Sequence, residues 1–508
     1  MKKTLHAIVA LLISSASMYA GEPIKIVYNA SVSANASSGK FAPYMIGSWN
    51  YGRVNAKAGL WHDGIIKKET DLSRRFSWGA GFEYMLGYGS AAPYTRYNAA
   101  SDSWSANYRR QAPARIQQFY GELKYRSVYL LAGMKERHSR IVDDTLSSGD
   151  LTRSNNSRPI PGIAAGFIDF VDIPLTNGWV QIDGEIMYGK FTDSEYKRQT
   201  FNYYHGNLAT DLYYIYRRCY FRTKPSQPLN LTIGMQAAGQ FGGRTVYYSK
   251  GSISKTEERG FSIKDALKMF FPTEGSGRDY YEGNSLGSWD VKLLYRFKNG
   301  ASLSAYFEGP WEDGSGIGRQ NGFDGLWGLQ YNFAKQGIVS KILFEYFDFT
   351  NQSGPIHYST DAVEGSSITQ GITGGDDYYN NLFYGPYSNY GMSIGSPFVV
   401  SPLYNLDGSP NYCHNKARGF HTAAEGGAGA WSYKLMLSYQ LAGGQGRIPS
   451  YKRLHDTSML AKVQWRPVAS LPGLRLSAEA AFDKGNLRGN NFGILAGISY
   501  SGSFTFGK

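Results

Sequence analysis

Residues 492–506 constrain the fold most, because their side chains alternate between two kinds almost without a break. The apolar set is Phe492, Ile494, Ala496, Ile498, Tyr500, Gly502, Phe504 and Phe506. The intervening set is small and mostly polar: Gly493, Leu495, Gly497, Ser499, Ser501, Ser503 and Thr505. Successive side chains of a strand point to opposite faces, so the segment predicts a strand with one apolar face. A soluble sheet can alternate too, but an apolar, aromatic-tipped last strand is typical of outer-membrane barrels.

The same alternation recurs upstream. It is found at 289–297, 303–307, 327–333, 342–346, 431–441, 459–465 and 474–482. The face opposite the apolar one carries charges such as Asp290, Lys292, Glu345 and Lys434. Unpaired charges are costly in a packed sandwich core, whereas they suit a lumen filled by water or by loops.

The connections between these strands alternate in length. Short connections include 126–127, 222–228 and 466–473, and the long ones are 89–115, 137–162, 190–209, 241–287, 309–325, 349–418 and 442–457. Short periplasmic turns and long outer loops are typical of membrane barrels. We therefore predict a transmembrane antiparallel β-barrel of about 18 strands with short periplasmic turns and long extracellular loops. Either 24–34 or 41–49 is the first strand, and we favour 24–34.

The first 20 residues have the pattern of a secretory signal. Lys2 and Lys3 precede an apolar run at 7–13, and small residues follow up to Ala20. We expect cleavage near Ala20, which leaves 21–508 as the barrel in the bacterial outer membrane. The remaining sequence has no run of 18 apolar residues, so a helical membrane protein is excluded.

The chain is basic, with a formal net charge of +13. This charge favours acidic partners such as an anionic polysaccharide or lipopolysaccharide, or it simply keeps the loops soluble. Arg137, Arg140, Arg153 and Arg158 lie in or near one predicted outer loop, and arginine suits carboxylates and phosphates. The lysines and arginines do not cluster into a nucleic-acid patch, so no nucleic-acid partner is expected.

Segment 376–398 is dense in tyrosine and asparagine. Tyrosine offers an apolar ring with a hydroxyl, and asparagine offers a paired donor and acceptor, so this mixture suits sugar rings. The same segment could instead pack on itself and plug the lumen, and the two roles are compatible.

The sequence carries no pattern that predicts catalysis or metal binding. Segment 307–328 is rich in glycine and acidic residues but lacks the ligand spacing of an EF-hand loop. Neither a GxSxG elbow nor an HExxH helix is present. We expect no enzyme activity, no catalytic residue, no cofactor and no metal.

Several stretches together resemble the capsule assembly Wzi family in the form found in Bacteroidota. They are 43–53, 146–163, 283–290, 307–329, 344–357, 374–398 and 483–500, of which EDGSG and DDYYN are the most specific. The resemblance implies an outer-membrane barrel of about 18 strands that holds capsular polysaccharide at the cell surface and is not itself the export channel. Proteobacterial members carry an N-terminal helical segment, whereas this sequence becomes strand-like at Ile24, so any plug would come from the long loops.

The resulting hypothesis is a non-enzymatic surface lectin for capsular or extracellular polysaccharide. Its other partners would be outer-membrane lipid or lipopolysaccharide and the capsule export machinery. The residues predicted to bind polysaccharide are Tyr378, Tyr379, Asn380, Tyr384 and Tyr390, with Arg158 and Arg319 as partners for acidic groups. The alternative is a general diffusion porin or sugar-uptake channel, and a barrel hydrolase is the weakest of the three.

Overall fold

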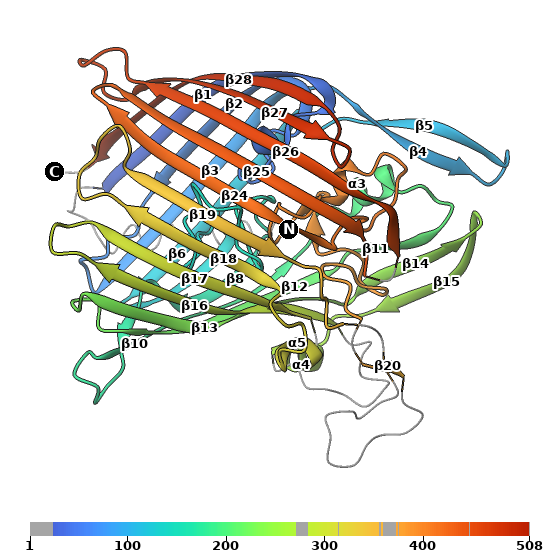
Figure 1. Cartoon of the computed structure of the whole chain (residues 1–508), viewed down its shortest axis with the longest axis horizontal. Helices are drawn as coiled ribbons and strands as arrows, with labels where there is room; N and C mark the ends of the chain where they lie inside the picture. The colour runs from blue at the N-terminus through green and yellow to red at the C-terminus, as the bar shows by residue number, and fades with distance from the viewer. Residues whose placement is uncertain are drawn as a thin grey trace.

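Eighteen strands form one closed antiparallel barrel (Figure 1). The computed structural model describes residues 24–270, 283–312, 314–354, 357–358, 372–373, 375–446 and 448–506, and the predicted signal peptide lies outside these ranges. The strands, in order around the barrel, are β1 (Ile24–Phe41), β2 (Ala56–Lys68), β3 (Phe76–Gly89), β6 (Ala114–Tyr125), β7 (Val128–Met134), β8 (Gly162–Phe167) with β9 (Val171–Asp172), β10 (Val180–Lys190), β12 (Tyr213–Thr223), β13 (Leu229–Phe241), β16 (Asn284–Arg296), β17 (Ser302–Trp311), β18 (Gly325–Asn332), β19 (Lys341–Asp348), β24 (Ala417–Ala428), β25 (Trp431–Gly444), β26 (Pro449–Trp465), β27 (Leu474–Gly485) and β28 (Asn491–Phe506). β8 and β9 both pair with β10 and count as one interrupted strand.

The first and last strands close the barrel. β1 pairs with β28 in a register that runs from Ile24 opposite Phe506 to Ser37 opposite Gly493. Within the described ranges, closure leaves the barrel wall without a strand edge free to pair with another chain. The predicted fold and the preferred first strand are thus confirmed, while the alternative first strand at 41–49 contains the short helix α2 (Tyr44–Gly47).

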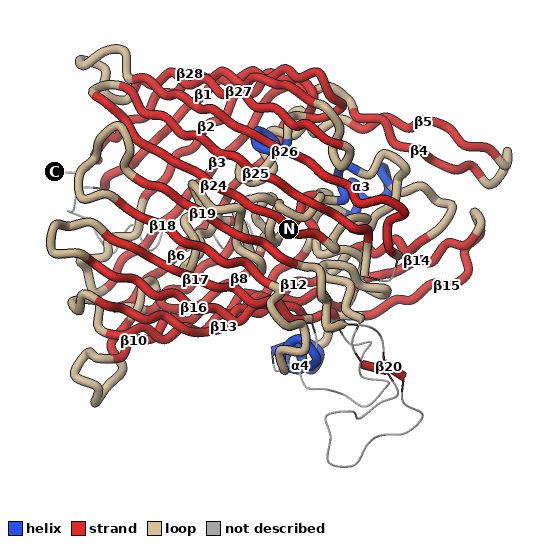
Figure 2. Tube along the Cα trace, in the orientation of Figure 1, coloured by secondary structure: helices blue, strands red, loops and turns tan. Residues whose placement is uncertain are grey.

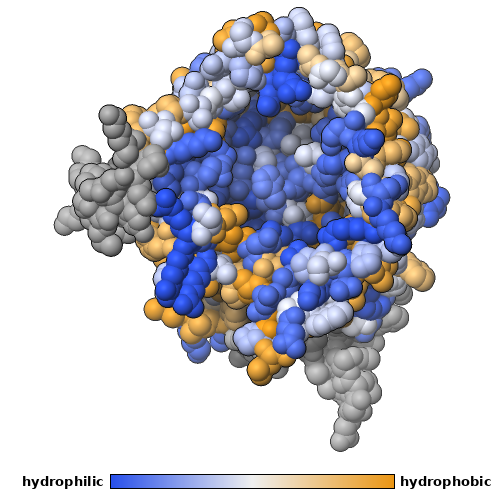
Figure 3. All heavy atoms as spheres, turned by 90° about the vertical axis from the view of Figure 1, so that its left-hand side faces the viewer, coloured by the Kyte–Doolittle hydropathy of each residue, from blue (hydrophilic) through white to orange (hydrophobic). Residues whose placement is uncertain are grey.

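The wall has an apolar outside and a polar inside, as the alternation predicts. On β28 the side chains of Phe492, Ile494 and Ile498 are exposed on the outer face. Inward-facing carboxylates such as Glu308 and Glu345 are fully buried in the barrel. Seen from the end that carries the short turns, the barrel has a hollow lined with hydrophilic residues (Figure 3).

Tyrosine rings cover glycines on the neighbouring wall strands. Tyr306 on β17 lies opposite Gly328 on β18, and a Cβ atom at Gly328 would lie 2.0 Å from Cζ of Tyr306. Tyr220 opposite Gly234 is arranged in the same way. An aromatic ring over a glycine in the next strand restores the packing that the glycine lacks. The abundance of both residue types in this chain, 61 Gly and 40 Tyr, serves the wall as well as the loops.

The long connections all leave the wall at one end of the barrel, opposite the end where β1 begins and β28 ends (Figure 2). They contain β4 (Ala92–Asn98), β5 (Ser103–Arg109), α3 (Ser194–Thr200), β11 (Gly206–Thr210), β14 (Gly243–Ser249), β15 (Ser252–Arg259), α4 (Ile263–Phe270), α5 (Gly314–Ile317), β20 (His357–Tyr358), β21 (Ile372–Thr373), β22 (Ser388–Asn389), β23 (Met392–Ser393) and the 3-10 turn η2 (Pro402–Tyr404). None of the helices within the described ranges has the length and hydropathy that crossing a membrane would need.

The predicted long loop at 442–457 is mostly strand. β25 continues to Gly444 and β26 begins at Pro449, so only 445–448 connect them. Lys452, Arg453 and His455 interrupt the apolar alternation, and such an interruption predicts a loop. These residues lie at the end of β26 that carries the long connections, where a strand can project past the apolar belt and needs no apolar outer face.

Candidate functional site

A segment of the β7–β8 connection folds into the lumen, and we call residues 140–157 the plug segment. Its contacts reach four strands on one side of the barrel wall. Lys292 Nζ on β16 donates to the Ile141 carbonyl (2.5 Å), Ser147 Oγ donates to Glu345 on β19 (2.6 Å), His421 Nε2 on β24 donates to the Leu146 carbonyl (2.7 Å) and Gln236 Nε2 on β13 donates to Asp150 Oδ2 (3.0 Å). These strands belong to one consecutive run of the wall, from β13 to β24, so the plug segment is held along that side of the lumen.

Arg153 anchors the plug segment to the wall strands β10 and β12. Its guanidinium lies 3.1 Å from Glu185 and 3.5 Å from the ring centroid of Tyr216. Arg218 also pairs with Glu185, at 3.4 Å. Glu185, Tyr216 and Arg218 are buried, and buried charges are tolerated when they are paired in this way.

A second inward layer, formed by residues 376–403, lies on the plug segment. The Tyr379 hydroxyl donates to the Leu151 carbonyl (2.5 Å), and the Tyr387 hydroxyl donates to the Thr152 carbonyl (2.9 Å). Gln440 Nε2 on β25 donates to the Phe398 carbonyl (2.6 Å). The sequence left two roles open for this tyrosine-rich segment, sugar binding and plugging of the lumen. The inward contacts are those expected for plugging.

The structure brings only two of the seven predicted binding residues together at a cleft. Tyr378, Tyr379 and Tyr384 have 1%, 3% and 0% of their surface exposed, so their rings belong to the interior. Asn380 donates to the carbonyl of Tyr412, which follows this layer in the chain. Arg319 packs on Phe307, on the outer face of β17, and therefore lies apart. Arg158 and Tyr390 are in contact at a cleft and remain candidate binding residues.

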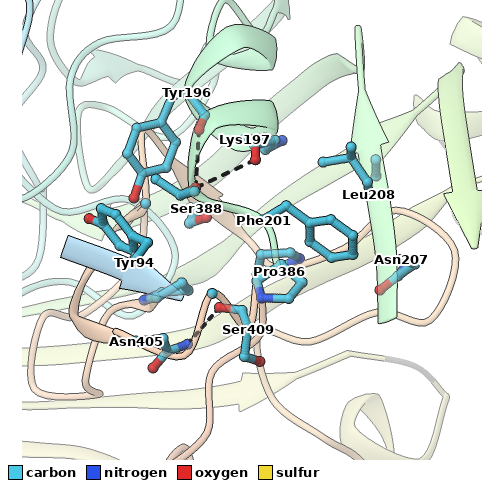
Figure 4. A pocket seen from close by; sticks show the side chains of 16 residues that line it. Tyr94, Tyr196, Lys197, Phe201, Asn207, Leu208, Pro386, Ser388, Asn405 and Ser409 are labelled. Atoms are coloured by element: carbon cyan, nitrogen blue, oxygen red, sulfur yellow. Dashed lines mark hydrogen bonds between the residues drawn. The ribbon is translucent and has the colours of Figure 1, made fainter. Parts of the chain in front are cut away.

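The first cleft at the long-loop end is lined by rings and amides, and we call it the aromatic cleft (Figure 4). Its principal lining residues are Tyr94, Tyr196, Phe201, Asn207, Ser388, Asn405 and Ser409. Rings beside hydroxyls and amides provide the apolar and polar contacts that a sugar needs. Sequence reasoning missed this site because its walls come from β4, α3, β11 and the 376–410 region, which no local pattern relates.

The second cleft is lined by three arginines, and we call it the arginine cleft. Its walls are Gly52, Asn55, Arg109, Gln111, Ala112, Arg115, Arg158, Asn389, Tyr390 and Met392. The Arg158 guanidinium lies 4.5 Å from the ring centroid of Tyr390, and that of Arg109 lies 4.1 Å from the ring of Tyr196. Burial lowers the pKa of the Arg158 guanidinium below its ordinary value, and the nearby Arg109 charge acts in the same direction.

The two clefts are neighbours. The rings of Tyr196, in the aromatic cleft, and Tyr390, in the arginine cleft, lie 6.1 Å apart between centroids. An extended molecule could therefore contact both clefts at once. Within the described ranges, no group of three or more His, Cys, Asp or Glu side chains is arranged to hold a metal ion.

Comparison with known proteins gives the fold. No family model and no curated protein matches the chain. Among solved structures, it is similar to Wzi, an outer membrane protein of Escherichia coli described as involved in group 1 capsule assembly and as a carbohydrate-binding β-barrel, with a TM-score of 0.54 and 15% identity over 97% of this chain and 87% of that one. It is also similar to the outer membrane protein OprD from Pseudomonas aeruginosa (TM-score 0.48, 8% identity, 96% of each chain) and to OccAB2 from Acinetobacter baumannii (0.47, 9%, 95% of this chain and 98% of that one). The first likeness shows that the chain has the fold of an outer-membrane barrel.

Proposed function

We propose that this protein is a non-enzymatic outer-membrane lectin that attaches capsular or extracellular polysaccharide at the cell surface. The observation that carries the proposal is that the plug segment and the 376–403 layer fold into the lumen, with two adjoining clefts among the long loops. A lumen occupied in this way is better suited to holding a polymer than to passing it. The carbohydrate binding described for Wzi, which shares the fold, supports the same role.

The aromatic cleft is the first binding site that we assign to a glycan. Carbohydrate sites use side-chain amides and hydroxyls, which the cleft holds in Asn207, Asn405 and Ser409, and the buried ring of Phe201 forms the apolar wall behind them. Its edge is preorganised, since Asn405 Nδ2 donates to the Ser409 carbonyl at 3.0 Å. Little side-chain ordering would then accompany binding.

The experiment that tests this function measures the ratio of cell-attached to released polysaccharide in a strain lacking the gene. We expect released polymer to rise and attached polymer to fall, with total polymer unchanged. Wild-type protein should restore attachment, whereas Ser409→Trp, which fills the aromatic cleft, should not. Ser252→Trp, at an exposed position on β15, is the matched control and should restore attachment fully.

A diffusion or sugar-uptake channel is the second candidate. The hydrophilic hollow at the short-turn end favours it (Figure 3). Planar-bilayer recordings separate the two functions: a large, steady conductance from the wild-type protein would support a channel. An unchanged ratio of attached to released polymer in the deletion strain would count against the lectin, and shortening of the polymer on incubation with pure protein would point to a hydrolase.

A further inference from the structure

The arginine cleft contains more positive charge than its own acidic residues neutralise. Among the described residues, Arg109, Arg115 and Arg158 form no ion pair with a carboxylate, although carboxylates are close by. Arg53 pairs with Asp63 at 3.4 Å and with Glu136 at 2.6 Å, and it also contacts Glu83. Asp193, which accepts a hydrogen bond from the Tyr390 amide, pairs with Lys197. These acidic groups are therefore engaged elsewhere, and within the described part of the chain the three guanidinium groups of the cleft have no carboxylate as an ion-pair partner.

Several polar atoms of the cleft are buried without a hydrogen-bond partner among the described residues. They are Nε of Arg109, Arg115 and Arg158, together with Oε1 of Gln111 and Oδ1 of Asn389. An unpaired buried donor or acceptor destabilises a structure unless something satisfies it. The set consists of cationic donors with neutral amide acceptors beside them. A ligand with an anionic oxygen and adjacent hydroxyl groups would satisfy both kinds.

Two of the arginines are held in place before any ligand arrives. The Arg109 guanidinium lies over the ring of Tyr196 at 4.1 Å, and the Arg158 guanidinium lies over the ring of Tyr390 at 4.5 Å. The Tyr390 hydroxyl donates to the Thr192 carbonyl at 2.8 Å, and Arg158 Nη2 donates to the Ile116 carbonyl at 2.8 Å. Planar guanidinium groups fixed in this way bind carboxylates in a defined geometry.

The cleft lies inside the wall, away from the lipid-facing surface. Arg115 on β6 packs over the ring of Trp61, which is buried on the inner side of β2. The next residue, Ile116, is exposed on the outer face. A lipid headgroup beside the barrel would meet Ile116 rather than Arg115. The occupant therefore comes from the loop-covered mouth.

We propose that the arginine cleft binds the carboxylate of an acidic sugar, so that the polysaccharide attached by this protein contains uronic acid or a similar carboxylated residue. This inference rests on the proposed lectin function and specifies its substrate class. The carboxylate would lie among the three guanidinium groups, with sugar hydroxyls donating to Gln111 and Asn389. The remainder of the chain would continue toward the aromatic cleft past Tyr390 and Tyr196.

Binding of an oligogalacturonate to the purified full-length barrel in detergent tests the proposal. We expect the wild-type protein to bind this probe and to bind its carboxyl-reduced form at least about tenfold more weakly, since a charge-assisted hydrogen bond contributes on that order. Arg158→Gln and Asn389→Asp should each weaken oligogalacturonate binding by about tenfold or more. Arg96→Gln is the matched control, because Arg96 stacks on Tyr203 at 4.5 Å outside the cleft.

The outcomes separate this inference from the lectin function. Equal affinity for the carboxylated and reduced probes, or unchanged binding by Arg158→Gln in a protein that retains its folded gel mobility, would overturn it. Displacement of the probe by lipopolysaccharide alone would overturn it too, in favour of a lipid phosphate. In cells, loss of polymer attachment in the deletion strain but full attachment with Arg158→Gln would leave the lectin function standing and reject the acidic-sugar site.

Discussion

The guanidinium of Arg153 in the plug segment lies 3.1 Å from Oε1 of Glu185 on the wall strand β10. Glu185 also pairs with Arg218, which keeps Asp183 at 2.9 Å, so removal of Glu185 would leave Arg153 without its carboxylate partner. Removing one member of a buried pair typically costs about 3–5 kcal/mol. Because the pair joins the plug segment to the wall, its loss destabilises the state in which the plug segment lies in the lumen.

We therefore predict that Glu185→Gln opens the barrel. Planar-bilayer recordings of the wild-type protein should be nearly silent, whereas the variant should show frequent open events. Glu479→Gln is the control: Glu479 pairs with Lys462 between two wall strands at 2.6 Å and does not touch the plug segment. Silence from Glu185→Gln would show that the other plug contacts suffice.

Gly328→Ala should disturb the plug through the wall. A Cβ atom there would lie 2.0 Å from Cζ of Tyr306, whose hydroxyl donates to Glu345. Glu345 in turn accepts from Ser147 Oγ and from the Ser148 amide. We expect a loss of about 1–3 kcal/mol in the free energy of unfolding in lipid vesicles, as for other overpacked sites.

The matched control for this substitution is Gly121→Ala on β6. Nothing lies within 4 Å of the Cβ atom that it would add. Denaturant titration followed by tryptophan fluorescence should give the control the wild-type midpoint. Equal midpoints for both variants would mean that Tyr306 can move aside without cost.

The attachment of the 349–416 connection should depend on pH through Asp324. This buried carboxylate accepts hydrogen bonds from the amides of Asn351 (2.9 Å) and Gln352 (2.7 Å). Burial raises the pKa of Asp324 to about 6. The closed state then binds the proton more tightly than an opened state with an ordinary pKa near 3.9, so closure is most stable below about pH 4 and weakens up to about pH 6.

The expected loss is on the order of 3 kcal/mol across that interval, with little change above it. Hydrogen exchange of residues 349–354, corrected for the intrinsic effect of pH, measures it. Asp324→Asn should remove the dependence. Stability that increases from pH 4 to pH 6 in the wild-type protein would contradict the assignment.

The sequence was sufficient for the wall but not for the clefts. Alternation around Phe492–Phe506 is a local property of a strand, and an even number of such strands allows β1 and β28 to pair antiparallel. The aromatic cleft, in contrast, joins Tyr94, Phe201 and Ser409 from separate loops, and no periodicity links them. Tyrosine and asparagine in 376–398 indicated two roles equally, because the residues that bind sugars also pack well against backbone carbonyls.

The contacts of the arginines could not be predicted from the sequence either. The sequence indicates Arg158 from its loop. Arg109 at the end of β5 and Arg115 at the start of β6 lie in sequence that resembles an ordinary strand and connection. Only the fold of the intervening loops places the three guanidinium groups on one cleft. The position of a residue along the chain predicts that it lies at the long-loop end of the barrel. It does not predict which side chains it contacts at that end.

Trp431 and Trp465 lie opposite each other on β25 and β26, next to short turns, with stacked rings 5.2 Å apart. Tryptophan at this level anchors a barrel in the interface between lipid and water. We predict that Trp431→Ala lowers the free energy of unfolding by about 0.5–1.5 kcal/mol for the ring pair, with a further loss from the lipid contact. That further loss should appear in lipid vesicles and shrink in detergent micelles, because a micelle adapts its shape to the protein.

Trp104→Ala, on the β5 hairpin strand beyond the wall, should show no such difference between the two media. If both variants lose the same stability in both media, the Trp431–Trp465 pair packs the wall and does not set its depth in the membrane.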